Sequence, residues 1–235
     1  MKNFCLALLT ILSFQLSAQG LIGAWENVSQ DSTGRSVRCV VIFSENHQVA
    51  TWYDAETGAF ISCNGGLWEV EENTITETVE FHTSEPERVG TSVSFTYELD
   101  GDELRHEFGG FWKRVDDGTP GALQGAWLIS GRMRNGEIQE RDTNRPRKTM
   151  KILSGTRFQW IAYNTETKQF MGTGGGTYTT VDGKYTENIE FFSRDDSRVG
   201  ASLEFDYDIK EGKWHHSGNN SKGEPMYEVW SQRND

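Results

Sequence analysis

Four polar residues recur in the two halves of the chain at a constant offset of 110 positions, and together they could form a binding or catalytic site. The pairs are Glu77/Glu187, Glu80/Glu190, Arg88/Arg198 and His106/His216. A carboxylate, a guanidinium and an imidazole can hold an anionic or hydroxylated ligand, or can act as acid and base on a substrate. The alternative is that these residues form structural ion pairs, and their presence in both halves slightly favours it.

Strand alternation limits which of these side chains can share a site. Glu187 and Glu190 are three residues apart, so on a strand they point to opposite faces and only one can point inward. A buried carboxylate is costly without a partner, which Arg198 or Tyr178 can supply. The predicted ligand site combines polar and aromatic side chains of the second half: Tyr178, Glu187, Glu190, Arg198, Tyr207, Trp214 and His216.

An internal repeat predicts the domain organisation that holds these residues. Residues 53–106 align with residues 163–216 without a gap, with 17 identities in 54 positions. The motif Leu-x-Gly-Ala-Trp also recurs, beginning at Leu21 and at Leu123. The two halves are therefore one duplicated domain, with a junction near residues 116–122, where Asp, Gly, Thr and Pro cluster. We expect two separately folding units.

Both halves are expected to form β-strands, because no segment keeps a helical period and several alternate between apolar and polar residues. Leu203, Phe205 and Tyr207 alternate with acidic residues, which is typical of a half-buried strand. The expected strands are 21–28, 37–44, 48–53, 59–70, 74–82, 90–99, 103–108 and 110–114, then 124–130, 147–153, 157–163, 169–180, 184–192, 199–208, 212–217 and 226–231. Eight short strands per half predict an all-β fold of two tandem antiparallel up-and-down β-barrels.

A Gly-x-Trp motif lies on the first expected strand of each half, at Gly23/Trp25 and Gly125/Trp127. On an eight-stranded meander, this motif resembles the lipocalins and the wider calycin barrels. Residues 163–216 also look like a group of secreted, lipocalin-like proteins of Bacteroidetes with no settled function. The resemblance implies two lipocalin-like barrels, over residues 20–116 and 121–235, and it leaves the chemistry open.

A basic segment indicates which barrel is expected to bind the ligand. Residues 132–151 hold seven basic side chains against three acidic ones: Arg132, Arg134, Arg141, Arg145, Arg147, Lys148 and Lys151. In lipocalin-like barrels this connection overhangs the open end, where it would attract an anion; the alternative is a solvated loop. The equivalent segment, residues 29–36, is short. We therefore expect the ligand cavity in the second barrel.

The first residues predict the compartment. Lys2 precedes an apolar run over residues 4–16, which ends in the small residues Ser17 and Ala18, as in a secretory signal peptide over residues 1–19. The run is too short to span a bilayer. We expect a secreted or periplasmic protein with no membrane span. A formal net charge of −12 disfavours nucleic acid as a partner.

The cysteines and glycines bear on redox state and cofactors. An oxidising compartment would favour a disulfide between Cys39 and Cys63, whereas a meander places one strand between theirs, about 9.6 Å, which exceeds the ~7 Å limit for bridging. The sequence leaves this disulfide open. No Cys or His cluster has zinc spacing, and residues 172–176 lack the helix that dinucleotide binding needs, so their glycines predict a bulge or a close backbone approach. We expect no metal and no cofactor.

Three functions remain in competition. The first is binding of a small molecule, anionic or hydroxylated, in the second barrel. The second is an enzyme in which Glu187 or Glu190 acts with His216 as an acid and base pair, although no catalytic residue is assigned. The third is a surface or matrix component without a cavity. Convergence of a histidine and a glutamate on a cavity would separate them.

Overall fold

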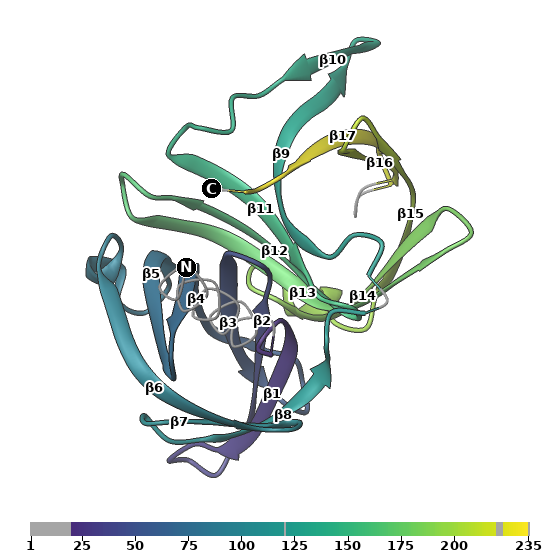
Figure 1. Cartoon of the computed structure of the whole chain (residues 1–235). Coiled ribbons are helices and arrows are strands. Elements are labelled where there is room, and N and C mark those ends of the chain that lie inside the picture. Colours follow the sequence, from purple (N-terminus) through teal and green to yellow (C-terminus); the bar gives the residue numbers. More distant parts are fainter. Residues whose placement is uncertain (1–19, 120, 220–222, 235) are drawn as a thin grey trace, which may run out of the picture.

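The computed structural model describes residues 20–119, 121–219 and 223–234, so the signal peptide expected over residues 1–19 lies outside the described part. The first half is a closed antiparallel barrel whose eight strands follow chain order (Figure 1). These strands are β1 (Gly23–Gln30), β2 (Ser36–Phe43), β3 (His47–Asp54), β4 (Phe60–Glu71), β5 (Thr74–His82), β6 (Ser92–Asp100), β7 (Glu103–His106) and β8 (Phe111–Asp116). A 3₁₀ turn, η1 (Pro86–Arg88), connects β5 to β6.

The second half repeats this barrel and adds one strand. Its strands are β9 (Gly125–Arg134), β10 (Glu137–Glu140), β11 (Arg147–Leu153), β12 (Arg157–Asn164), β13 (Gln169–Val181), β14 (Lys184–Phe192), β15 (Ser202–Lys210), β16 (Lys213–Asn219) and β17 (Pro225–Gln232), with a 3₁₀ turn η2 (Asp196–Arg198). β9 pairs with both β11 and β17, which closes the barrel. The expected all-β fold of two tandem eight-stranded barrels is confirmed, and β10 is the strand that the periodicity did not predict.

The Gly-x-Trp motif has the same structural role in both barrels. The indole Nε1 of Trp25 donates to the carbonyl of Leu21 at 2.9 Å, and that of Trp127 donates to Leu123 at 2.8 Å. Both rings are buried, so each tryptophan fills the start of its barrel while its one polar atom keeps a partner.

The glycine pairs at the centre of β4 and β13 mark equivalent bulges. The strand register shifts between Gly65 and Gly66 and again between Gly175 and Gly176. A Cβ atom on Gly176 would lie 2.1 Å from the carbonyl oxygen of Asn188, so only glycine fits there. The expectation of a bulge with close backbone approach at residues 172–176 is confirmed.

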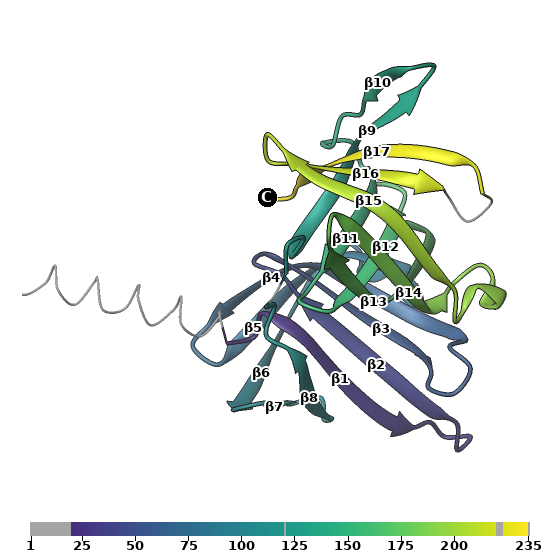
Figure 2. The ribbon, with the colours of Figure 1, turned by 90° about the vertical axis from the view of Figure 1, so that its right-hand side faces the viewer.

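An apolar core lies between the two barrels, and its contacts are reciprocal. The Tyr53 hydroxyl donates to Glu190 at 2.8 Å, and its repeat counterpart Tyr163 donates to Glu80 at 2.6 Å. Figures 1 and 2 show that the barrels meet along the sheets formed by β2 to β5 and β11 to β14. The barrels thus meet as two copies of an isologous dimer would. Independent folding of residues 121–235 stays a prediction, because that fragment would expose this face.

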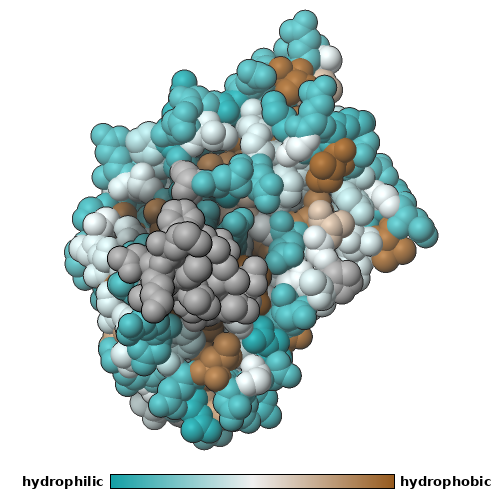
Figure 3. All heavy atoms as spheres, viewed as in Figure 1, coloured by the Kyte–Doolittle hydropathy of each residue, from teal (hydrophilic) through white to brown (hydrophobic). Residues whose placement is uncertain are grey.

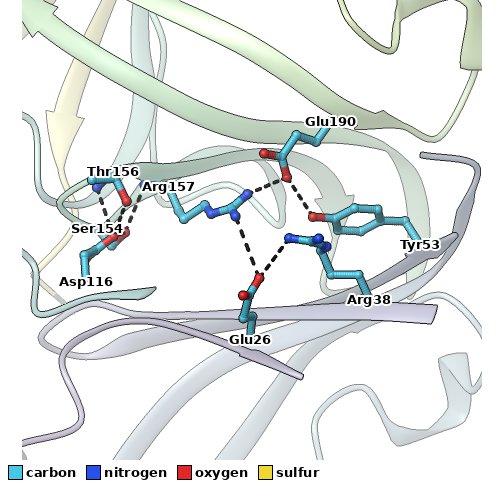
Figure 4. A network of polar contacts seen from close by, with 8 residues as sticks. All are labelled: Glu26, Arg38, Tyr53, Asp116, Ser154, Thr156, Arg157 and Glu190. Atoms are coloured by element: carbon cyan, nitrogen blue, oxygen red, sulfur yellow. Dashed lines mark hydrogen bonds and ion pairs between the residues drawn. The ribbon is translucent and has the colours of Figure 1, made fainter. Parts of the chain in front are cut away.

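Polar groups flank this core and tie the second barrel to the first (Figure 4). Arg157 forms ion pairs with Glu190 and, at 4.0 Å, with Glu26 of the first barrel. Asp116 at the end of β8 accepts hydrogen bonds from the β11–β12 turn, including one of 2.8 Å from Ser154 Oγ. A network of this kind fixes how the barrels are oriented relative to each other.

Cys39 and Cys63 are free and buried, so the disulfide between them is not formed. β3 lies between their strands, where Cys39 pairs with Trp52 and Cys63 pairs with Thr51. The side chains also point to opposite faces of the sheet. Cys39 packs in the interior of the first barrel, and Cys63 packs in the core between the barrels. Strand alternation therefore excludes the bond even without the extra distance.

Candidate functional site

A cavity of about 270 Å³ lies inside the first barrel. Its walls are mostly apolar and aromatic, with Val41, Phe43, Ala50, Trp52, Ile75, Val79, Val93, Phe95, Leu104, Phe108 and Trp112 among them. Six polar side chains also line it: Gln48, Asn64, Glu77, His82, Arg88 and His106. An apolar chamber with a few convergent polar groups is the usual form of a small-molecule site.

Strand alternation positions the acidic residue of this cavity. On β5, Ile75, Glu77 and Val79 point inward together, whereas Glu80, which lies in the bulge, faces the second barrel. The η1 turn then brings Arg88 back to the same chamber. The first barrel therefore holds one carboxylate against a largely apolar wall.

The surroundings of Glu77 shift its protonation equilibrium. Burial raises the pKa of Glu77 to about 7, although the nearby charge of Arg88 opposes this shift. Burial also lowers the pKa values of His82 and His106 below their ordinary value, so both imidazoles are neutral near pH 7. Glu77 is thus divided between its protonated and ionised forms at neutral pH.

Two buried polar atoms in the cavity wall are available to a ligand. Among the described residues, Gln48 Oε1 and His106 Nδ1 make no hydrogen bond. The other ring nitrogen of His106 accepts a hydrogen bond from Trp112 Nε1 at 3.1 Å, which fixes the imidazole in place. Since buried polar groups normally have partners, these atoms are candidate contacts for a polar group on a bound molecule.

The corresponding space in the second barrel is filled by larger side chains. The equivalent inward positions are Val41/Lys151, Ala50/Trp160, Ile75/Tyr185 and Leu104/Trp214. The strand registers support this equivalence, because Val41 lies opposite Trp25 just as Lys151 lies opposite Trp127. Tyr185 and Trp214 are fully buried. The aromatic rings therefore fill the part of the second barrel that corresponds to the cavity of the first barrel.

A buried ion pair completes the filling of the second barrel. Lys151 Nζ lies 2.7 Å from Glu187 Oε1, and both side chains are less than one tenth exposed. The ammonium also lies 4.9 Å from the ring centroids of Tyr185 and Trp214. Burial, followed by the charge of Lys151, lowers the pKa of His216 to about 4. Lys151 is thus the partner of the inward carboxylate, where the sequence suggested Arg198 or Tyr178.

The structure brings together only part of the predicted site. Glu187, Trp214 and His216 share the interior of the second barrel, and Tyr207 packs against the edge of that core. Tyr178 also packs in this interior against Tyr185, and its hydroxyl donates to the Ser154 carbonyl. Glu190 instead faces the first barrel, and Arg198 of η2 pairs with Asp195, which precedes that turn. Glu187 and Glu190 do point to opposite faces, as alternation requires.

Residues 132–140 of the basic segment belong to a hairpin. β9 and β10 extend it away from the barrel, with Asn135 and Gly136 at the turn (Figure 2). The hairpin also exposes two apolar side chains, Met133 and Ile138, and an apolar patch is visible on it in Figure 3. Arg132 pairs with Glu228 at 2.9 Å. The hairpin therefore projects from the barrel instead of lying over its open end.

Two closed eight-stranded barrels, the first with an interior cavity, fit the class of calycin-like β-barrel proteins. Residues 122–233, which are the second barrel, match a family described as "Domain of unknown function (DUF4488)". The chain is also similar to a crystal structure of an uncharacterized protein from Bacteroides eggerthii DSM 20697, at 13% identity and a TM-score of 0.32, over 47% of this chain and 98% of that one. No curated protein matches.

Two absences hold for the described part of the chain, which is residues 20–119, 121–219 and 223–234. Within these residues, no three His, Cys, Asp or Glu side chains form a group that could hold a metal ion. The same residues contain no helix of sufficient length and apolar character to cross a membrane.

Proposed function

We propose that the protein binds a small, largely apolar molecule in the cavity of the first barrel. The observation that carries this proposal is the contrast between two copies of one domain. The second copy fills its interior with Trp160, Tyr185 and Trp214, whereas the first has the smaller residues Ala50, Ile75 and Leu104 there and holds a cavity of about 270 Å³. Since protein interiors are normally close-packed, a hollow of this size inside a stable barrel indicates a use.

The polar wall supports a ligand with one polar end. Glu77, Gln48 and His106 offer hydrogen-bonding groups within an otherwise apolar chamber. A depression on the outer surface shares Trp52 and Arg88 with the cavity, so the two adjoin each other. We therefore propose the ligand site in the first barrel, whereas the sequence suggested the second. Together with the leader-like first residues, this supports a binding protein of the periplasm or the cell exterior.

Leu104→Trp tests this proposal, because it places in the first barrel the ring that Trp214 contributes to the second. We expect 1-hexanol to bind the wild-type protein and to bind the variant at least tenfold more weakly, while the melting temperature is unchanged or higher. Isothermal titration calorimetry and thermal unfolding give the two readouts. Equal binding by both proteins, or no binding by the wild type, would contradict the proposal.

Acid–base catalysis in the same cavity is a second candidate, and one observation favours it. Glu77 and His106 both line the cavity, and a carboxyl group with a pKa of about 7 suits a general base at neutral pH. Binding is the stronger proposal, because Trp112 already occupies one ring nitrogen of His106 and the remaining wall is mainly apolar.

A further inference from the structure

We propose that the molecule bound by the first barrel presents a protonated amine to Glu77. This inference rests on the proposed binding function and specifies the chemical class of the ligand. It is drawn from the second barrel, in which the same domain already holds an ammonium group at the equivalent carboxylate. That ammonium belongs to Lys151 of the chain itself.

The interior of the second barrel holds an ammonium group between a carboxylate and aromatic rings. Lys151 Nζ lies 2.7 Å from the carboxylate of Glu187 and sits 5.3 Å from the ring centroid of Trp230, with Tyr185 and Trp214 slightly closer. A cation gains from the negative faces of aromatic rings when it is withdrawn from water. The carboxylate supplies the opposite charge that a buried ammonium requires. Lys151 is in effect a tethered amine ligand.

The first barrel keeps the acceptor and lacks the cation. Glu77 occupies the position of Glu187, while Val41 stands where Lys151 does. Trp112 is retained at the position of Trp230, since each pairs across the sheet with the residue at position 104 or 214. A free amine can therefore take the place of the lysine head group, and its apolar body can occupy the space that aromatic rings fill in the second barrel.

The other ionisable groups around the cavity do not supply this cation. His82 and His106 have pKa values lowered by burial and are neutral near pH 7. Arg88 is 40% exposed and forms an ion pair with Glu85 at 3.4 Å, so its charge is largely screened by water. Arg88 would instead favour an anionic ligand, and the test below includes that outcome.

Three six-carbon probes that differ only in their head group separate these cases: hexylamine, 1-hexanol and hexanoate. At pH 8 we expect hexylamine to bind the intact protein at least tenfold more tightly than either of the others. Because an ammonium stabilises ionised Glu77, its affinity should also rise between pH 6 and pH 8, whereas that of 1-hexanol should stay within about twofold. Isothermal titration calorimetry measures both effects.

Two variants assign the preference to the proposed contact. Glu77→Gln should remove the advantage of hexylamine and leave 1-hexanol binding within about twofold of the wild type. Val41→Lys supplies an internal ammonium, as in the second barrel, and should abolish hexylamine binding; if it does not fold, Glu77→Gln still decides. Equal binding of all three probes, tightest binding of hexanoate, or an amine preference that survives Glu77→Gln would overturn this inference alone. Failure of all probes to bind would overturn the proposed function itself.

Discussion

Replacing Lys151 with methionine is expected to lower the free energy of unfolding by about 3 to 5 kcal/mol, because it leaves the buried carboxylate of Glu187 without its partner. Methionine keeps most of the apolar length of the lysine, so lost packing contributes little. The loss should be smaller at pH 5 than at pH 8, since an unpaired buried carboxyl group takes up a proton more readily as the pH falls. Urea denaturation at the two pH values measures the effect.

Two further variants show whether the loss comes from the unpaired charge. Lys151→Met combined with Glu187→Gln should recover most of the stability, because both charges are then removed together. Lys213→Met on β16 serves as the matched control, since this lysine is exposed and its replacement should change stability by less than about 0.5 kcal/mol. A single Lys151→Met variant as stable as the wild type would show that the pair does not hold the second barrel together.

Replacing Glu77 with glutamine is expected to stabilise the ligand-free protein at pH 8 by up to about 3 kcal/mol and to have little effect at pH 4.5, because each pKa unit is worth about 1.4 kcal/mol. The pKa of Glu77 is raised to about 7 in the folded state from an ordinary value of 4.5. The folded protein therefore holds more protons than the unfolded chain between these pH values. Stability falls as the pH rises from 4.5 through 7, and glutamine removes that loss.

The control for this prediction is Glu69→Gln, which alters an exposed glutamate on the neighbouring strand β4. The difference between Glu77→Gln and the wild type should grow with pH, whereas the difference for Glu69→Gln should stay small at every pH. A Glu77→Gln variant that is less stable than the wild type at pH 8 would mean that the ionised carboxylate is satisfied inside the empty barrel.

The fold could be predicted because its signals are local and repeated. Alternation at Leu203, Phe205 and Tyr207 and the duplicated Gly-x-Trp motif predicted the strands and the two barrels. The short strand β10 was missed because the basic residues around it were interpreted as a loop, although Asn135-Gly136 is a common sequence for a tight hairpin turn.

The site could be predicted only in part, because which barrel is hollow depends on side-chain volumes across the interior. The recurring Glu and His residues include Glu77 and His106, which line the cavity of the first barrel, whereas the basic segment drew the prediction to the second copy. The decisive signal was present in the repeat alignment, where Trp160 and Trp214 stand opposite Ala50 and Leu104. Lys151 was counted with the basic segment, and periodicity alone did not show that it pairs with a residue on a distant strand.

A crystal structure of the protein with hexylamine tests the central claim most directly, namely that the ligand site is the interior of the first barrel. We predict density for one molecule inside that barrel, with its nitrogen within hydrogen-bonding distance of Glu77 and its chain against Leu104 and Trp112, and an unchanged pair between Lys151 and Glu187. Density inside the second barrel, or an empty first barrel at a hexylamine concentration that saturates binding in solution, would contradict the account.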